Sequence, residues 1–434
     1  MPEVVNLADR IEKQLPAELK RFMQEAGKMA QGRGMALYLV GGVVRDMLLG
    51  RANLDLDLVV EGDAIALARE MADIRQGKVV IHPRFGTARV QWDRWSVDLA
   101  TTRSETYARP GALPTVHPSS LRNDLFRRDF TVNAMAVDIG PARYGELVDI
   151  YGGIADLERR LIRVLHDRSF IDDTTRIWRA LRYEQRLDFQ IEPDTMELIG
   201  HGLPMLEAIS GDRIRHELEL VLREELPERT LRRAGGLGVL SKLHPSLKAG
   251  GWLAEKFALA RAQASPDLPS TAVYLSLLMY RLSESELDRV LSYLRFTKAV
   301  TRVLRDTADL KDELAILVSV ELKPSAIYSL LQDYSVAALN STMIATESAV
   351  IRESIGLFLR KLRHVKPALT GGDLARMGIA PGHRIKEILS RLRQAKLDGE
   401  VSSKQDEERL VVGWGGLNTN GLSHICRPLP DFLF

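Results

Sequence analysis

Apolar and polar positions follow different periods in the two parts of the chain. Up to about residue 150, short apolar runs bounded by turn residues alternate with stretches of helical spacing. Short runs rich in β-branched and aromatic residues indicate strands, whereas apolar residues three and four apart indicate helices. Helices are predicted over 7–28 and 64–74. The predicted strands cover 36–40, 55–60, 78–81, 87–92, 96–100 and 132–139.

From residue 156 onward strand signals almost disappear. Helical spacing is clear over 174–187, 213–224 and 283–294. The stretch 366–373 predicts a break followed by a helix start, with Asp373 as the cap. The expected fold is therefore an α/β head followed by all-α domains, in a chain of 434 residues that is long enough for several domains.

Composition narrows the class of protein. No stretch approaches the roughly 20 uncharged apolar residues of a membrane span, and the N-terminus has an amphipathic pattern rather than that of a signal peptide. The single cysteine, Cys426, excludes an internal disulfide and a cysteine-based zinc site. We therefore expect a cytoplasmic protein with no membrane partner. A net charge of +2 means that attraction to nucleic acid would depend on local patches.

Two aspartates, Asp55 and Asp57, lie one residue apart in the predicted strand 55–60. Residues i and i+2 of a strand share a face, so both carboxylates would project together, with Leu54, Leu56 and Leu58 packed behind them. Hard oxygen ligands select Mg²⁺ or Mn²⁺. The alternative is a pair of solvated carboxylates on an edge strand.

The preceding turn contains Gly41 and Gly42, and Arg45 follows on a predicted helix. Backbone N–H groups at a helix start, together with an arginine, can bind phosphate, although Gly-Gly is also an ordinary tight turn. A phosphate-binding turn close to a metal-binding carboxylate pair indicates a nucleoside triphosphate site.

Three further polar residues are candidates for the same site. Asp98 would supply a third carboxylate if its strand lies beside Asp57. Arg128 precedes the strand-like run FTVNAMAVDIG and is the better candidate of the Arg127–Arg128 pair for the triphosphate. Asn133 would bond the sugar or, alternatively, cap backbone groups.

The segment IDDTTRIWRALRYEQR predicts a helix that carries an arginine stripe. Asp172 or Asp173 would be the N-cap, and Ile177, Leu181 and Leu187 would face inward. The stripe consists of Arg176, Arg179 and Arg182. Three unpaired arginines would need an anionic ligand, unless they pair with neighbouring carboxylates or are solvated.

These motifs together resemble the bacterial-type tRNA nucleotidyltransferase and poly(A) polymerase family, the class II branch of the polymerase-β-like nucleotidyltransferases. The resemblance rests on GGVVRDMLLG with DLD, FRRDFTVNA, DIYGGIADLERRLIR, DDTTRIWRALRYEQRLDF and GDRIRHELELVL, over 39–222. A weaker resemblance to the family's tail covers 369–400.

The resemblance implies four domains and a reaction. The domains are a nucleotidyltransferase head at 1–148, a helical neck with a templating motif at 149–225, a helical body at 226–360 and a tRNA-binding tail at 361–434. The implied reaction adds CCA, or its terminal A, to tRNA 3′ ends from CTP and ATP without a nucleic-acid template. A poly(A) polymerase and an inactive RNA-binding relative are the alternatives.

The resemblance also implies roles for individual residues. Asp55 and Asp57 would be catalytic and bind Mg²⁺, while Gly42, Arg45 and Arg128 would contact the nucleotide. Asp173 and Arg176 would pair with the base edge, where a carboxylate and a guanidinium together satisfy C and A but not G and U. Arg179 and Arg182 would support that pair. Asp172 stands where the motif normally has glutamate, so we expect a shorter contact there.

Two other segments bear on substrate choice. The segment 104–123, which contains Pro110, Pro114 and Pro118, is predicted to be a loop. In the family this loop helps to switch the nucleotide specificity from C to A, and its full length argues against an enzyme that adds only CC.

The segment 361–396 has nine Lys or Arg and two Asp or Glu. This basic charge suits binding to an RNA backbone or, alternatively, is solvated surface charge. The oligomeric state stays open.

Overall fold

The computed structural model describes residues 5–109, 111–319 and 322–415. The chain forms two compact units. The first contains the chain up to Gly250 and Asp288–Arg295, and the second contains Gly251–Leu287 and the chain from Phe296. The finer division into head, neck, body and tail stays a prediction. Cys426 lies outside the described residues.

A seven-stranded sheet is the centre of the described part of the first unit, with strand order β3-β4-β5-β2-β1-β8-β9. Only β2 and β5 pair in parallel within it. Its strands are β1 (Ala36–Val40), β2 (Leu56–Glu61), β3 (Lys78–His82), β4 (Thr87–Trp92), β5 (Trp95–Thr101), β8 (Ala136–Asp138) and β9 (Leu147–Val148). Two smaller ladders are β6 (Arg103–Thr106) with β7 (Thr115–Pro118), and β10 (Leu161–Ile162) with β11 (Gln190–Ile191).

The predicted strands are present within one residue at either end, except the last. The prediction over 132–139 was too long, because the chain forms a 3₁₀ turn at Thr131–Asn133 before β8 begins. Thr131 Oγ1 donates to Asp156 Oδ2 at 2.7 Å, and the Asn133 side chain is also bonded within the protein. Such side-chain bonds favour a local turn over continuation of the ladder.

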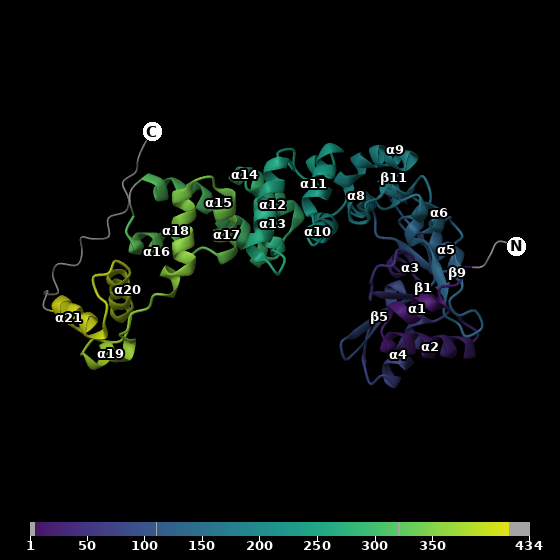
Figure 1. Ribbon diagram of the computed structural model, residues 1–434, viewed down its shortest axis with the longest axis horizontal. Helices are drawn as coiled ribbons and strands as arrows, with labels where there is room; N and C mark the ends of the chain where they lie inside the picture. Colours follow the sequence, from purple (N-terminus) through teal and green to yellow (C-terminus); the bar gives the residue numbers. More distant parts are fainter. Residues whose placement is uncertain (1–4, 110, 320–321, 416–434) are drawn as a thin grey trace. The chain divides into compact units, whose positions relative to one another are not determined.

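One face of the sheet packs against α1 (Ala8–Gln14), α2 (Ala17–Gly32) and α4 (Ala64–Ile74). The single helix predicted over 7–28 is broken at Pro16, which has no N–H to continue helical bonding and holds the residue before it extended. Leu56 and Leu58 are buried on this face as predicted, but Leu54 is 46% exposed because it precedes β2. Figure 1 shows these helices with β1 and β5 in the first unit.

The opposite face of the sheet is only partly covered. Helix α5 (Leu121–Phe126) packs there against β1 and β2, and its Leu125 joins a core with Val40 and Val59. Over β2, β5, β4 and β3 this face lines an open cavity instead. Alternation along β2 places Asp57 on this open face.

Helices follow the sheet in the first unit. They are α6 (Gly153–Glu158), α7 (Ser169–Asp172), α8 (Thr175–Leu187), α9 (Pro193–Gly202), α10 (Gly211–Val221) and α11 (Pro227–Gly236), and α3 (Gly42–Leu48) lies earlier in the chain. Helix α8 packs against α10 and α11 and buries Ile177, Leu181 and Leu187, as predicted. Its N-cap is Thr174, so the prediction of Asp172 or Asp173 was wrong by one or two residues.

The described residues of the second unit contain helices and no β-strand. The helices are α12 (Gly251–Ala264), α13 (Thr271–Met279), α15 (Lys298–Ser319), α16 (Pro324–Leu331), α17 (Val336–Ala345), α18 (Ala349–Arg360), α19 (Gly371–Arg376), α20 (His383–Leu397) and α21 (Lys404–Gly415), and α14 (Glu284–Leu294) spans the border between the units. Thr370, not Asp373, is the N-cap of α19, and Asp373 completes a capping box from the third helical position. None of the described helices has the length and apolar character needed to cross a bilayer.

Candidate active site

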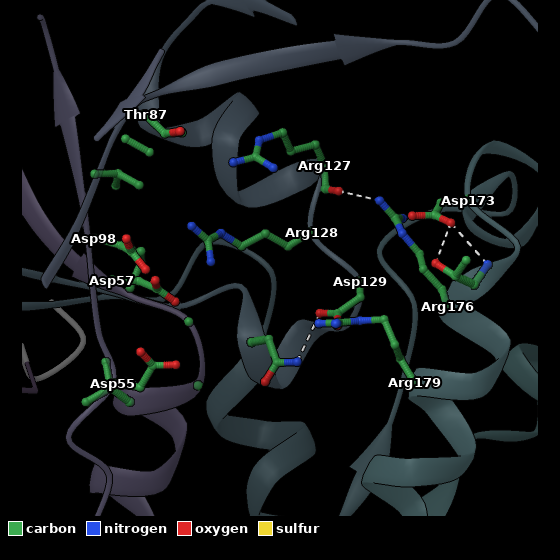
Figure 2. A pocket seen from close by; sticks show the side chains of 18 of the residues that line it. Asp55, Asp57, Thr87, Asp98, Arg127, Arg128, Asp129, Asp173, Arg176 and Arg179 are labelled. Carbon is green, nitrogen blue, oxygen red and sulfur yellow. Dashed lines mark hydrogen bonds and ion pairs between the residues drawn. The ribbon is translucent and has the colours of Figure 1, made fainter. Parts of the chain in front are cut away.

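A cavity of about 1370 Å³ lies in the first unit between the open sheet face and the helices α8 and α10. Figure 2 shows Asp55, Asp57 and Asp98 on one side of it and Asp173, Arg176 and Arg179 on the other. The structure thus brings together residues more than a hundred positions apart in the chain. All predicted site residues line this cavity: Gly42, Arg45, Asp55, Asp57, Asp98, Arg128, Asp173, Arg176, Arg179 and Arg182.

Two of the carboxylates, Asp57 and Asp98, lie on the parallel strands β2 and β5. Asp57 on β2 is the register partner of Asp98 on β5, so the condition set for Asp98 as a third carboxylate, that its strand lies beside Asp57, is met. Asp98 nevertheless accepts hydrogen bonds from Arg89 Nε at 2.8 Å and Nη2 at 2.6 Å. Within the described ranges, no three carboxylate, histidine or cysteine side chains already converge in the manner of a metal site. Of the three carboxylates on this side of the cavity, Asp55 and Asp57 are exposed and Asp98 is only partly so.

The pKa of Asp57 is raised to about 6. The main cause is desolvation of the carboxylate by the surrounding protein, although the side chain is exposed on the side of the cavity. Arg128 lowers the pKa, whereas the charges of Asp55 and Asp98 raise it. A divalent cation would relieve this repulsion between carboxylates.

Gly41 shapes the turn between β1 and α3. Its φ of +80° favours glycine, and a Cβ there would lie 3.1 Å from Arg128 Nη1 and 3.6 Å from Asp57 Oδ2. Arg128 also donates to Asp124 Oδ2 at 3.0 Å, which holds its guanidinium beside the turn. The sequence predicted a close-approach turn at Gly41 and Gly42, and Gly41 is the position of the two with a positive φ.

Arg45 is part of the cavity floor. Its side chain donates to Asp46 Oδ1 from Nε at 2.9 Å and from Nη2 at 2.8 Å, and to Asn133 Oδ1 from Nη1 at 2.6 Å. Only 2% of Arg45 is exposed, so direct contact with a triphosphate stays a prediction. Asn133 also donates to Asp129 Oδ1 at 3.0 Å and therefore joins Arg45 to Asp129 rather than capping backbone.

Asp173 and Arg176 lie at the start of α8, and neighbouring groups orient both. Asp173 Oδ1 accepts from Thr175 N at 3.0 Å, from Thr175 Oγ1 at 2.6 Å and from Arg213 Nη2 at 2.7 Å. Arg176 donates to Ser169 Oγ at 2.7 Å and to the carbonyl of Arg127 at 2.6 Å. The side chains are thus held in place before any ligand binds.

Asp172, which takes the place of the family's glutamate, lies apart from these contacts. It pairs with Arg168 at 3.3 Å and is not among the residues that line the cavity.

The arginines of the stripe on α8 have hydrogen-bond partners within the protein. Arg179 donates to Asp129 Oδ2 from Nε at 2.9 Å and from Nη2 at 2.6 Å, and Arg182 donates to Glu224 at 3.3 Å. Burial would raise the pKa of Asp129, but Arg179, Asn133 and Arg176 outweigh it and hold the pKa at about 2. The alternative of pairing with neighbouring carboxylates therefore describes Arg179 and Arg182, and the argument from unpaired charge was wrong for them.

The predicted loop over 104–123 is partly ordered as the antiparallel pair β6 and β7. Glu105 on β6 accepts from Arg127 Nη1 at 3.0 Å and from Tyr107 Oη at 2.8 Å. Farther along, the carbonyl of Gly111 accepts from Arg213 at 3.0 Å. This segment thus contacts the groups that hold Arg176 and Asp173.

Sequence reasoning missed several residues of the cavity wall. Arg213 and Glu217 lie within the motif GDRIRHELELVL, so the motif was the signal that could have found them. Nothing in the spacing of 104–123 pointed to Glu105 and Tyr107, which face the cavity only because β6 turns back towards α5.

Comparison with known proteins gives consistent matches along the chain. The model of the poly A polymerase head domain matches residues 37–163, and that of the probable RNA and SrmB-binding site of polymerase A matches 188–250. A solved CCA-adding enzyme, apo form II, superposes with a TM-score of 0.79 at 30% identity over 95% of this chain and 100% of that one. A Thermotoga maritima CCA-adding enzyme complexed with tRNA has a TM-score of 0.74 at 29% identity, over 95% and 100%.

Two relatives extend the comparison to whole sequences. An A-adding tRNA nucleotidyltransferase of Geobacter sulfurreducens is 35% identical over 94% of this chain, which spans only 48% of that protein. An A-adding tRNA nucleotidyltransferase of Halalkalibacterium halodurans is 34% identical over 92% of this chain and 94% of its own length. With this match along nearly the full length of both proteins, the chain belongs to the bacterial-type tRNA nucleotidyltransferase family.

Proposed function

We propose that the protein completes the CCA end of tRNA without a nucleic-acid template, either by transfer of nucleotides from CTP and ATP or by transfer of the terminal A from ATP alone. The observation that carries this proposal is the single cavity in which Asp55 and Asp57 lie opposite Asp173 and Arg176. One side offers oxygen ligands for a metal-bound triphosphate, and the other offers a carboxylate and a guanidinium for a base edge. The relatives named for this reaction support the proposal.

Asp55 and Asp57 suit Mg²⁺. Mg²⁺ is commonly held by one or two carboxylates together with substrate phosphates, so a complete ring of protein ligands is not required. The raised pKa of Asp57 reflects carboxylate crowding that a cation would relieve. When bound, the metal would lower the pKa of the attacking hydroxyl and neutralise charge on the phosphates.

The reaction is an in-line displacement. The 3′ oxygen of the RNA forms a bond to the α-phosphorus, the bond from that phosphorus to the β-phosphate oxygen breaks, and pyrophosphate leaves. Arg128 lies beside both Gly41 and Asp57, where its positive charge would hold the triphosphate near the carboxylates.

Choice of base falls to Asp173 and Arg176. Cytosine and adenine present an amino donor beside a ring-nitrogen acceptor, whereas guanine and uracil present a carbonyl beside an N–H. A carboxylate accepts from the amino group and a guanidinium donates to the ring nitrogen, so C and A fit. Arg179 and Arg182 support this pair through their contacts with Asp129 and Glu224.

The proposed step is addition of the terminal A, since the two relatives described above are named A-adding and one of them is matched over 94% of its own length. The test uses purified protein and three forms of one tRNA, ending before the first C, before the second C and before the terminal A. Each is incubated with CTP alone and with ATP alone. Extension only of the third form, and only by ATP, is expected; C addition to the first two would establish full CCA addition instead.

A poly(A) polymerase is the second candidate, because the matching head-domain model carries that description. It would add many A residues to an unstructured RNA, whereas a tRNA nucleotidyltransferase stops after the CCA end. Incubation of a short unstructured RNA with ATP separates the two by the length of the product.

The tail residues are proposed to bind the tRNA backbone. Arg384 and Lys386 are exposed on α20, within the basic segment 361–396. Contact with RNA phosphates would make affinity fall steeply with salt concentration. We place the activity in the cytoplasm, in agreement with the single cysteine in the sequence.

A further inference from the structure

The cavity extends beyond the space between the carboxylates and α8. It continues over the outward positions of β3 and β4, where its lining is Val80, His82, Thr87, Arg89 and Gln91. Its volume of about 1370 Å³ exceeds the roughly 300–1,000 Å³ of a typical small-molecule pocket. The part over β3 and β4 therefore offers room for a second ligand.

One row of paired residues connects this part to the reaction centre. Val80 pairs with Arg89, Arg89 pairs with Asp98, and Asp98 pairs with Asp57. Directly paired residues share a face of the sheet, and neighbouring strands are about 4.8 Å apart. Arg89 is thus two strands, or roughly 10 Å, from Asp57 across the sheet.

Arg89 is the cation of this row. Its Nε and Nη2 donate to Asp98, while its Nη1 makes no hydrogen bond with the described residues. The side chain is 50% exposed. Guanidinium groups bind phosphate through several N–H donors, so Arg89 can hold a phosphate while it still contacts Asp98.

The direction of attack decides which ligand belongs here. In the proposed function the incoming nucleotide would occupy the side of Asp173 and Arg176, with its α-phosphate near Asp55 and Asp57. In an in-line displacement the attacking oxygen approaches from the side opposite the leaving group. The strand side, over β4 and β3, is then the part of the cavity left for the RNA end.

We propose that the outward face of β3 and β4 holds the 3′-terminal nucleotide of the RNA, with Arg89 donating to its phosphate. This inference rests on the proposed function. Val80, which is 44% exposed, gives the nucleoside an apolar surface, and His82, Thr87 and Gln91 give it hydrogen-bonding groups. None of these groups is specific for one base, which suits an enzyme whose RNA end changes during synthesis.

The test measures RNA binding without nucleoside triphosphate, so that no chemistry contributes. One tRNA ending in CC is compared with the same tRNA lacking those two nucleotides. The wild type should bind the longer form about tenfold more tightly, as expected for charge-assisted bonds. Arg89→Ala should bring this ratio close to one, and Arg89→Lys should give an intermediate value because the charge remains and the fork is lost.

Two variants separate binding from structural support. Arg94→Ala removes an exposed arginine from the β4–β5 turn, outside the cavity, and should keep the wild-type ratio. Asp98→Asn weakens the ion pair but leaves Arg89 in place, and should keep or increase the ratio. Steady-state kinetics should show a raised KM for tRNA and an unchanged KM for ATP in Arg89→Ala.

The outcomes are distinguishable. If Arg89→Ala extends tRNA with the wild-type binding ratio and tRNA KM, the inference is wrong and the proposed function stands. If Asp98→Asn lowers the ratio of the two tRNA affinities as much as Arg89→Ala does, the Arg89–Asp98 ion pair matters only for structure. That result also overturns the inference. A wild-type protein that neither binds nor extends tRNA overturns the proposed function and this inference together.

Discussion

Asp98 is the register partner of Asp57, yet its carboxylate is held by Arg89 on the next strand. The reaction centre therefore contains two carboxylates exposed to the cavity and a third that is partly neutralised. This arrangement leads to different expectations for the three aspartates.

Replacement of Asp55 or Asp57 by Asn should lower the rate of nucleotide incorporation by roughly 10³-fold or more, because a ligand for the catalytic metal is lost. The affinity for tRNA should change little, since the RNA contacts lie elsewhere. Single-turnover incorporation and equilibrium tRNA binding measure the two effects. Asp93→Asn, in the exposed β4–β5 turn, is the control; near-normal turnover in both site variants would contradict the metal assignment.

Incorporation should rise with pH through about 6, because the pKa of Asp57 is raised to about 6 and a protonated carboxyl cannot bind a cation. A higher Mg²⁺ concentration should move this acid limb to lower pH by competing with the proton. Asp98→Asn should move it in the same direction, because the charge of Asp98 raises the pKa of Asp57. Rate–pH profiles of the wild type and of Asp98→Asn at two Mg²⁺ concentrations check both shifts. An acid limb whose position does not change with Mg²⁺ concentration would contradict this interpretation.

Arg213→Ala should raise the KM for ATP by roughly tenfold and increase incorporation of the wrong nucleotides. Arg213 donates to Asp173 at 2.7 Å and to the carbonyl of Gly111 at 3.0 Å, and a hydrogen bond to a charged group contributes about 1.5–3 kcal/mol. Single-nucleotide incorporation with each of the four triphosphates measures the change. Arg223→Ala, exposed beyond α10, is the matched control; unchanged selectivity in Arg213→Ala would show that Thr175 alone positions Asp173.

Asp129→Asn should destabilise the first unit, and the effect should depend on pH. The pKa of Asp129 is about 2 in the folded protein and close to 4 when unfolded, which corresponds to about 3 kcal/mol of stabilisation near neutral pH. Because the folded pKa is the lower one, this contribution is present above pH 4 and decreases as the pH falls towards 2. Urea midpoints of wild type and variant at pH 7 and pH 3 should differ by less at pH 3.

The sheet and the main helices could be predicted from the chain because each is encoded locally. Strand 87–92 and helix 64–74 have their own periodicity, and both are present with those bounds. The failures occur where side chains compete with the backbone pattern. Asn133 bonds to Arg45 and Asp129, and Pro16 interrupts a helix, so the local pattern was overridden at both places.

The candidate site was predictable residue by residue but not in its connections. Asp55, Asp57 and Asp173 were found from spacing and motif, and they do line one cavity. The pairing of these carboxylates with arginines could not be found in this way, because Arg89 and Arg213 meet Asp98 and Asp173 only through tertiary structure. Arg213 lies in the motif GDRIRHELELVL, but Arg89 belongs to no local pattern that distinguishes it from ordinary surface charge.

Arg176 has two partners, Ser169 Oγ and the backbone carbonyl of residue 127. Every amino acid has that carbonyl, so no single substitution at position 127 removes the acceptor. The half of the Arg176 guanidinium that meets this carbonyl is therefore insensitive to point mutation at its partner, whereas the contact with Ser169 can be lost by substitution. The position of Arg176 therefore depends on the path of the backbone at residue 127 more than on which side chain stands there.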